Sequence, residues 1–197
     1  MPHSPELPWP GSPVVVAFTG HRPDKLGGYR GDSPVARRVR QALVQIVLRT
    51  VRKYPGAVFV CGMALGVDQW AAEAVLAARG RGLPCRLVAA IPFEGQQDRW
   101  PRPAREHYLR LLERADLVHV LWYGPVHSRG QARRLLLARN RWMVERASVL
   151  LAVWDGSPGG TGHTVRLALE RGLTVVRFDP RSPELGWQLL AAAPWSS

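Results

Sequence analysis

A glycine-rich stretch between an apolar run and a helical pattern is the part of this sequence best suited to binding an anion. Residues 155–164 read DGSPGGTGHT and separate the apolar run 149–153 from the helical pattern 164–171. Glycine adopts left-handed backbone conformations at little cost, so main-chain amides can approach a ligand closely. A helix beginning here also directs free N–H groups and its positive dipole end at that point. We therefore expect a phosphate or another anion here, with a plain glycine turn as the alternative. The residues expected to contact it are Gly159, Gly160, Thr161, Gly162 and Thr164.

A second loop, residues 62–68, has the same layout of apolar run, glycines and helix. Gly62 and Gly66 leave room for a phosphate or a ribose to approach the backbone. Asp68 falls in the first turn of the following helix, where its carboxylate can accept hydrogen bonds from ribose hydroxyls. Capping that helix, worth about 1 kcal/mol, explains Asp68 equally well. Both interpretations of Asp68 stay open.

The loops after the first and third apolar runs carry the remaining candidates for chemistry. Gly20, His21 and Arg22 close the first run, and Arg22 can grip a phosphate with two parallel hydrogen bonds while His21 donates or moves a proton. A purely structural role for this pair is the alternative. Glu94 follows the third run and can act as a general base or bind an amide or ribose. The candidate catalytic residues are thus Glu94, Asp68 and His21.

Other common site chemistries have no motif in this chain. The six histidines show no short metal-ligand spacing, so we expect no metal site. The sequence contains neither a GxSxG nucleophile elbow nor a GxxxxGK[ST] phosphate loop. No motif requires a cofactor, although a nucleotide-derived ligand fits the glycine-rich loops.

The elements around these loops predict an α/β fold. Six short apolar runs lack strict alternation, which is typical of parallel strands buried on both faces. They cover residues 14–18, 57–61, 86–91, 117–121, 149–153 and 174–178. Helical patterns lie between them at residues 34–52, 67–79, 103–115, 131–147 and 164–171. Such alternation predicts a doubly wound, mainly parallel, Rossmann-like sheet of about six strands with helices on both faces. Ligands of such sheets bind at the carboxyl ends of the strands, where the candidate loops lie.

One domain accounts for this pattern. We expect it to span residues 14–180, after a flexible lead-in at residues 1–13 that is rich in Pro and Gly and before a C-terminal extension at residues 181–197. The helix at 131–147 carries four large apolar residues that either pack in the core or form a homodimer contact. They are Leu135, Leu136, Trp142 and Met143.

Composition restricts the partners and the compartment. No apolar run approaches the roughly 18 residues needed to span a bilayer, so no membrane partner is expected. Cys61 and Cys85 are the two cysteines and neither has a CxxC partner, which favours the cytoplasm. The net charge of +12 invites a nucleic-acid partner, but all basic residues except Lys25 and Lys53 are arginines spread over many segments. Genomic bias toward arginine explains that pattern as well as a binding surface does.

Taken together in order, the motifs resemble the YpsA-like branch of the SLOG superfamily, a Rossmann-like group that also contains the LOG hydrolases and DprA. The motifs are TGHRP, KLGGY, GMALGVDQWAAE, IPFEGQ, RNRWMV and WDG with PGGTGHTV, within residues 14–178. The resemblance implies a small-molecule nucleotide as ligand, such as ADP-ribose, an NAD-related compound or a nucleoside phosphate. By motif, the implied contacts are Gly20, His21, Arg22, Gly62, Gly66, Asp68, Asn140, Gly159, Gly160 and Thr161.

One departure from the LOG pattern bears on catalysis. In the LOG hydrolases, PGG is followed by GTxxE with a catalytic glutamate, whereas Arg166 stands at the corresponding position here. A guanidinium in place of a carboxylate removes a general base and reverses the local charge. The resemblance therefore leaves three functions open: binding or sensing of a nucleotide, hydrolysis of an N-glycosidic or phosphate bond, and DprA-like binding of single-stranded nucleic acid.

Overall fold

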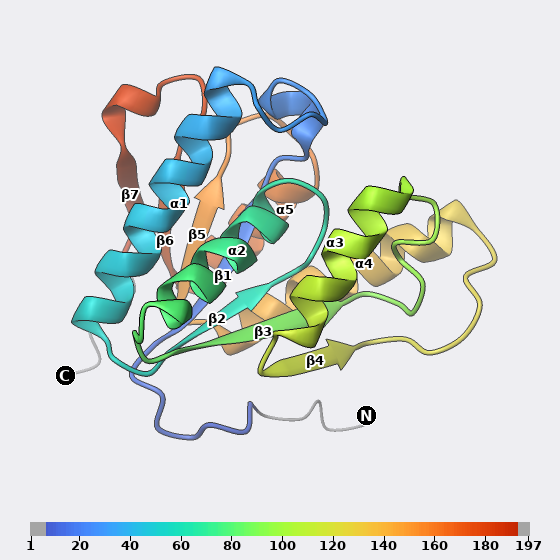
Figure 1. Cartoon of the computed structure of the whole chain (residues 1–197), viewed down its shortest axis with the longest axis horizontal. Coiled ribbons are helices and arrows are strands. Elements are labelled where there is room, and N and C mark those ends of the chain that lie inside the picture. The colour runs from blue at the N-terminus through green and yellow to red at the C-terminus, as the bar shows by residue number, and fades with distance from the viewer. Residues whose placement is uncertain (1–6, 193–197) are drawn as a thin grey trace.

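Seven strands in one sheet form the centre of the computed structural model, which describes residues 7–192 (Figure 1). The strand order is β4-β3-β2-β1-β5-β6-β7, and all neighbours are parallel except β6 and β7. The strands are β1 (Val15–Gly20), β2 (Ala57–Cys61), β3 (Cys85–Ile91), β4 (Leu117–Val120), β5 (Val149–Val153), β6 (Thr174–Phe178) and β7 (Trp187–Ala191). The predicted Rossmann-like α/β class is confirmed.

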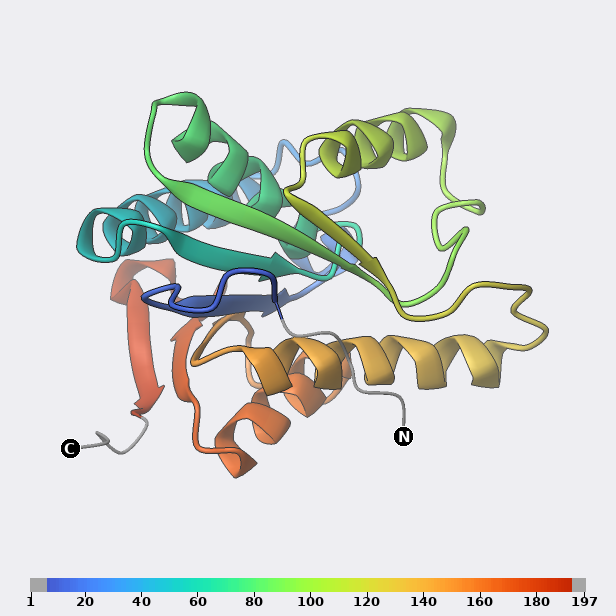
Figure 2. The ribbon, with the colours of Figure 1, turned by 90° about the horizontal axis from the view of Figure 1, so that it is seen from below.

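Within residues 7–192, five α-helices cover the two faces of the sheet (Figure 2). One face carries α1 (Pro34–Lys53), α2 (Val67–Gly80) and α3 (Arg102–Glu113), and the other carries α4 (Arg129–Arg146) and α5 (Gly160–Glu170). Two 3-10 helices, η1 (Pro23–Leu26) and η2 (Pro183–Leu185), lie in the connections. Because parallel neighbours need crossovers, this alternation follows from the order of elements along the chain.

Local sequence explains where α1 begins and which side of it is buried. The Ser33 hydroxyl accepts a hydrogen bond from the N–H of Ala36, and Pro34 occupies the first helical position, where its missing N–H is not needed. Val39, Leu43 and Val47 recur at helical spacing and are fully buried against the sheet.

The sheet separates two hydrophobic cores. Successive residues of β1 point to opposite faces, so Val16 and Phe18 join the core under α1, α2 and α3, while Ala17 joins the core under α4 and α5. Apolar residues are therefore needed at every position of the central strands. That requirement explains the uninterrupted apolar runs in the sequence.

A seventh strand adds to the edge of the sheet within the stretch expected as a C-terminal extension. β7 pairs antiparallel with β6, and the Trp187 indole N–H donates to the carbonyl of Ala42 in α1 at 3.1 Å. Residues 193–197 of that stretch lie outside the described residues, as do residues 1–6 of the expected lead-in. In the rest of the lead-in, Leu7 and Trp9 pack against the core under α4 and α5.

The strand order reverses between β1 and β5. From β1 the chain passes to α1 on one face, and from β5 it passes to α5 on the other. The connections after these two neighbouring strands therefore diverge and leave a crevice at their carboxyl ends. Over residues 7–192, no helix is long and apolar enough to cross a membrane.

Candidate functional site

A cavity of about 550 Å³ lies at the carboxyl ends of β1 and β5, where the strand order reverses. Its walls come from the end of β1, the loop that leads into α5, and one side of α4. Nine of the residues expected at the ligand site line it. They are Gly20, His21, Arg22, Asp68, Asn140, Gly159, Gly160, Thr161 and Gly162. Segments that lie far apart in the sequence thus converge on one hollow.

The N-terminus of α5 forms one end of this cavity. Gly159 is the N-cap at φ 146°, and no acidic residue falls in the first turn of this fully described helix. The N–H of His163 donates to the carbonyl of Gly159 at 2.9 Å. Earlier N–H groups of a helix have no partner within it, so those of Gly160, Thr161 and Gly162 are available to a ligand. The helix dipole adds partial positive charge there.

Cationic side chains outnumber carboxylates around the cavity. The lining cations are Arg22, Lys25, Arg133, Arg139 and Arg166, whereas Asp24 and Asp68 are the lining carboxylates. Lys25 also bridges two walls, because its ammonium donates to the Ser157 hydroxyl at 2.5 Å. A cavity with this balance of charge attracts anions.

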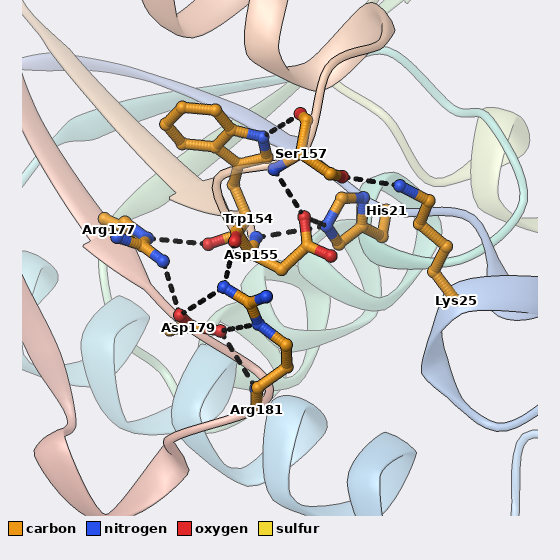
Figure 3. Close-up of polar contacts among 8 residues, drawn as sticks. All are labelled: His21, Lys25, Trp154, Asp155, Ser157, Arg177, Asp179 and Arg181. Carbon is orange, nitrogen blue, oxygen red and sulfur yellow. Dashed lines mark hydrogen bonds and ion pairs between the residues drawn. The ribbon is translucent and has the colours of Figure 1, made fainter.

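His21 is buried beside Asp155, a carboxylate that follows β5 (Figure 3). His21 Nε2 lies 2.8 Å from Asp155 Oδ1. Burial lowers the pKa of His21, and the charge of Asp155 offsets this only in part. Burial acts to raise the pKa of Asp155, but hydrogen bonds from Ser157 and the contact with His21 outweigh it, so that pKa lies well below its ordinary value. The pair is therefore a neutral imidazole beside an ionised carboxylate near pH 7.

Arg139 is a site residue that the sequence reasoning missed. Its buried guanidinium donates to the carbonyl of Gly62 and lies 3.7 Å from the carboxylate of Asp68, while its Nε donates to Asn140 Oδ1 at 2.8 Å. Burial raises the pKa of Asp68 and lowers that of Arg139, and each charge opposes the shift of the other. The signal in the sequence was spacing: Arg139 precedes the buried Trp142 by one helical turn.

Three expected ligand contacts lie behind the cavity wall. A side chain at Gly62 would overlap the guanidinium of Arg139, and one at Gly66, whose φ is 98°, would come within 2.7 Å of the His21 carbonyl. Both glycines thus permit close packing. The hydroxyl of Thr164 donates to the Gly160 carbonyl and accepts from Asn140, so Thr164 ties α4 to α5.

The three candidate catalytic residues separate in the structure. His21 and Asp68 line the cavity, but Glu94 is exposed and is absent from its walls. The N–H of Glu94 donates to the carbonyl of Trp122 at 3.0 Å, which holds the loop after β3 toward the loop after β4. Asp68 does not cap its helix by a side-chain bond; its carboxylate accepts from the N–H of Ala64 at 3.3 Å.

The apolar wall of the cavity comes from α4. Leu136, Leu137 and Met143 line the hollow, with Leu136 and Met143 about two helical turns apart, and Phe18 of β1 contributes from the sheet. Of the residues considered for a dimer contact, Trp142 and Met143 are buried within the chain. In the described part of the chain, no three His, Cys, Asp or Glu side chains lie close enough to hold a metal ion.

Comparison with known sequences places these features in a family. The YspA SLOG family model matches residues 16–170. A UPF0398 protein of Bacillus cereus (strain B4264) is 31% identical over 159 residues, which cover 80% of this chain and 84% of the relative. A UPF0398 protein of Bacillus thuringiensis (strain Al Hakam) is 30% identical with the same coverage.

Solved structures show the same fold at lower identity. DNA processing protein A from Helicobacter pylori, described for its single-stranded DNA binding mode, aligns with a TM-score of 0.58 and 21% identity over 84% of this chain and 65% of its own. DNA processing protein A (DprA) from Streptococcus pneumoniae aligns with a TM-score of 0.58 and 21% identity over 86% and 53%. This chain thus spans less than two thirds of either protein. The family match covers most of the chain and confirms the resemblance seen in its motifs: this chain belongs to the YspA SLOG family.

Proposed function

We propose that the cavity between β1 and β5 binds a nucleotide-derived ligand, with a phosphate at the N-terminus of α5. The observation that carries this proposal is the convergence of the free N–H groups of Gly160, Thr161 and Gly162 with the side chains of Arg22 and Lys25 on one hollow. Backbone donors, a helix dipole and cationic side chains together form a strong phosphate site.

The rest of the cavity suits the other parts of a nucleotide. Leu136, Leu137 and Met143 offer an apolar surface to a base, and the Asp68 carboxylate can accept hydrogen bonds from sugar hydroxyls. The volume of about 550 Å³ falls within the range of roughly 300–1,000 Å³ typical of small-molecule sites. This combination favours ADP-ribose, an NAD-related compound or a nucleoside phosphate over inorganic phosphate alone.

A charge substitution at the helix N-terminus tests the proposal by calorimetry with ADP-ribose, NAD, ADP and AMP. In Thr161→Glu a carboxylate enters the space assigned to phosphate, so we expect at least a tenfold loss of affinity. A carboxylate in the first turn of a helix is favourable for folding, so the variant should keep its stability. Thr161→Gln, the isosteric neutral control, should bind within about threefold of wild type because it adds no charge.

Three outcomes decide between the functions. Binding of the panel that Thr161→Glu abolishes supports the proposal, whereas no binding to any member contradicts it. A single-stranded oligonucleotide titrated at physiological salt tests the alternative that the DprA structures suggest. Chromatography of the nucleotides after incubation detects hydrolysis, for which His21 and Asp68 are the candidates that reach the cavity.

A further inference from the structure

Two arginines that follow α5 in the sequence hydrogen-bond to the main chain of the loop that leads into α5 (Figure 3). Arg177, in β6, donates from Nε to the carbonyl of Trp154 at 2.7 Å. Arg181, in the connection from β6 to β7, donates from its guanidinium to the carbonyl of Asp155. Both bonds go to the main chain at the start of the loop, so they restrain its path whatever side chains it carries.

Asp179 orients both of these arginines. Its carboxylate accepts from the Arg177 guanidinium, from the N–H of Arg181 at 3.0 Å and from the Arg181 guanidinium at 3.3 Å. Asp179 is itself buried. Burial acts to raise the pKa of Asp179, but the hydrogen bonds and charges of the two arginines outweigh it and lower that pKa. The three residues therefore form one charged cluster, which we call the C-terminal clamp.

Inside the loop, Trp154 and Asp155 connect the restrained main chain to the residues just before α5. The Trp154 indole N–H donates to the carbonyl of Ser157 at 2.7 Å, and Asp155 Oδ1 accepts from the Ser157 N–H at 2.9 Å. A side chain at Gly162 would lie 3.3 Å from the Trp154 ring, so the helix already rests against the indole. Clamp, loop and helix N-terminus thus form one continuous set of contacts.

We propose that the C-terminal clamp of Arg177, Asp179 and Arg181 holds the loop after β5 in the conformation that binds phosphate. This inference rests on the proposed function of the cavity. A glycine-rich loop has more conformational freedom to lose than any other, and contacts that order it beforehand raise affinity without touching the ligand. None of the three clamp residues lines the cavity, so each is a positioning residue.

The clamp also joins the ligand site to the edge of the sheet. Arg181 precedes η2 and β7, and all three clamp residues lie beyond residues 16–170, the part of the chain that the family model matches. In this chain, therefore, the conformation of a loop at the family site depends on a segment outside the matched region.

Inorganic pyrophosphate is the probe that isolates this effect, because it has no base or sugar to contact α4. Arg181→Ala removes an exposed side chain, so the fold should persist, and we expect the Kd for pyrophosphate to rise at least tenfold. Arg181→Lys should restore part of the affinity by keeping one charged donor. Arg171→Ala is the matched control: Arg171 pairs with Glu145 at 3.6 Å, at the far end of α5, and its loss should leave the Kd unchanged.

A second measurement reports on the loop without any ligand. The Trp154 indole N–H, assigned in a ¹⁵N spectrum with Trp154→Phe, should exchange with water at least fivefold faster in Arg181→Ala, because the Ser157 carbonyl is no longer held in place. An unchanged pyrophosphate Kd in Arg181→Ala overturns the proposal, even if the exchange rate rises. If wild type binds none of the nucleotides and no pyrophosphate, the proposed function fails. The exchange rate alone then decides whether the clamp orders the loop.

Discussion

The loops after β2 and β5 share one sequence pattern but differ in what lies against their glycines. Each runs from a buried strand through two or more glycines into a helix that Gly66 or Gly159 caps without a side-chain bond. The loop after β5 lines the cavity with its glycines, whereas the loop after β2 reaches it only through Ala64 and Asp68, and the guanidinium of Arg139 fills the space beside Gly62.

The difference lies in what satisfies each helix N-terminus. At α2, the N–H of Val67 donates to the His21 carbonyl at 3.3 Å, and the Asp68 carboxylate lies in the first turn. At α5, no side chain of its own first turn carries a negative charge. A glycine-rich strand-to-helix turn therefore indicates that something approaches the backbone closely, and only the fold determines whether it is a ligand or another part of the chain.

Arg139→Ala should have the largest effect on stability, because it removes the guanidinium that fills the space beside the loop after β2. The Asp68 carboxylate then stays buried without its partner, and we expect a loss of about 3–5 kcal/mol in the free energy of unfolding, measured by urea denaturation. Arg133→Ala, on the exposed side of the same helix, should change it by less than about 0.5 kcal/mol. Equal stabilities for the two variants would show that the Arg139–Asp68 pair does not hold this loop.

A pair of glycine substitutions compares the two loops directly. At Gly62 a methyl group meets the Arg139 guanidinium and displaces it, so Gly62→Ala should lose at least about 2 kcal/mol. At Gly160 nothing lies within 4 Å of an added Cβ, and alanine in a helix is favoured over glycine by roughly 0.5–1 kcal/mol. Thermal denaturation should place Gly160→Ala at or above wild type. A loss of stability in Gly160→Ala would mean that the loop after β5 is packed rather than open.

A smaller effect should appear in the pH dependence of stability, through His21, which contacts both loops. Its folded-state pKa lies below the unfolded value of 6.5, so the unfolded chain takes up the proton first as the pH falls. Stability from this group is complete above pH 6.5 and is lost as the pH drops toward the folded pKa. Urea denaturation at pH 7.5, 6.5 and 5.5 should show a shallower decline in His21→Gln than in wild type.

His119, whose pKa burial also lowers, remains in His21→Gln and accounts for a residual decline in the same range. Asp155 acts in a lower window: its depressed pKa stabilises the fold above the unfolded pKa of about 3.9, and that stability is lost at lower pH. If the free energy of unfolding declined equally with pH in wild type and in His21→Gln, His21 would not contribute to the pH dependence of stability.

Periodicity and strand ends predicted the sheet and the place of the cavity, because both depend on local apolar patterns and on a general property of parallel sheets. The role of Arg139 was not predictable from its residue type, since a charged helical residue normally faces water. The position of Glu94 outside the cavity was not predictable, because the direction of a loop depends on distant contacts, here the carbonyl of Trp122. β7 was missed because its edge position leaves only a weak apolar pattern: Trp187 is partly buried, whereas Gln188, Leu189 and Leu190 are exposed.

The regular geometry of α4 gives the cavity a wall on which polar and apolar side chains alternate. Its lining residues run from Arg133, which is exposed, through Leu136 and Asn140 to Met143, which is buried. At 1.5 Å per residue this wall is about 15 Å long, and its character alternates along the helix: charged at Arg133, apolar at Leu136, polar again at Asn140 and apolar at Met143. An elongated molecule that lies along this helix would meet a different side chain at each turn. The length of that molecule would decide how many turns of α4 it contacts.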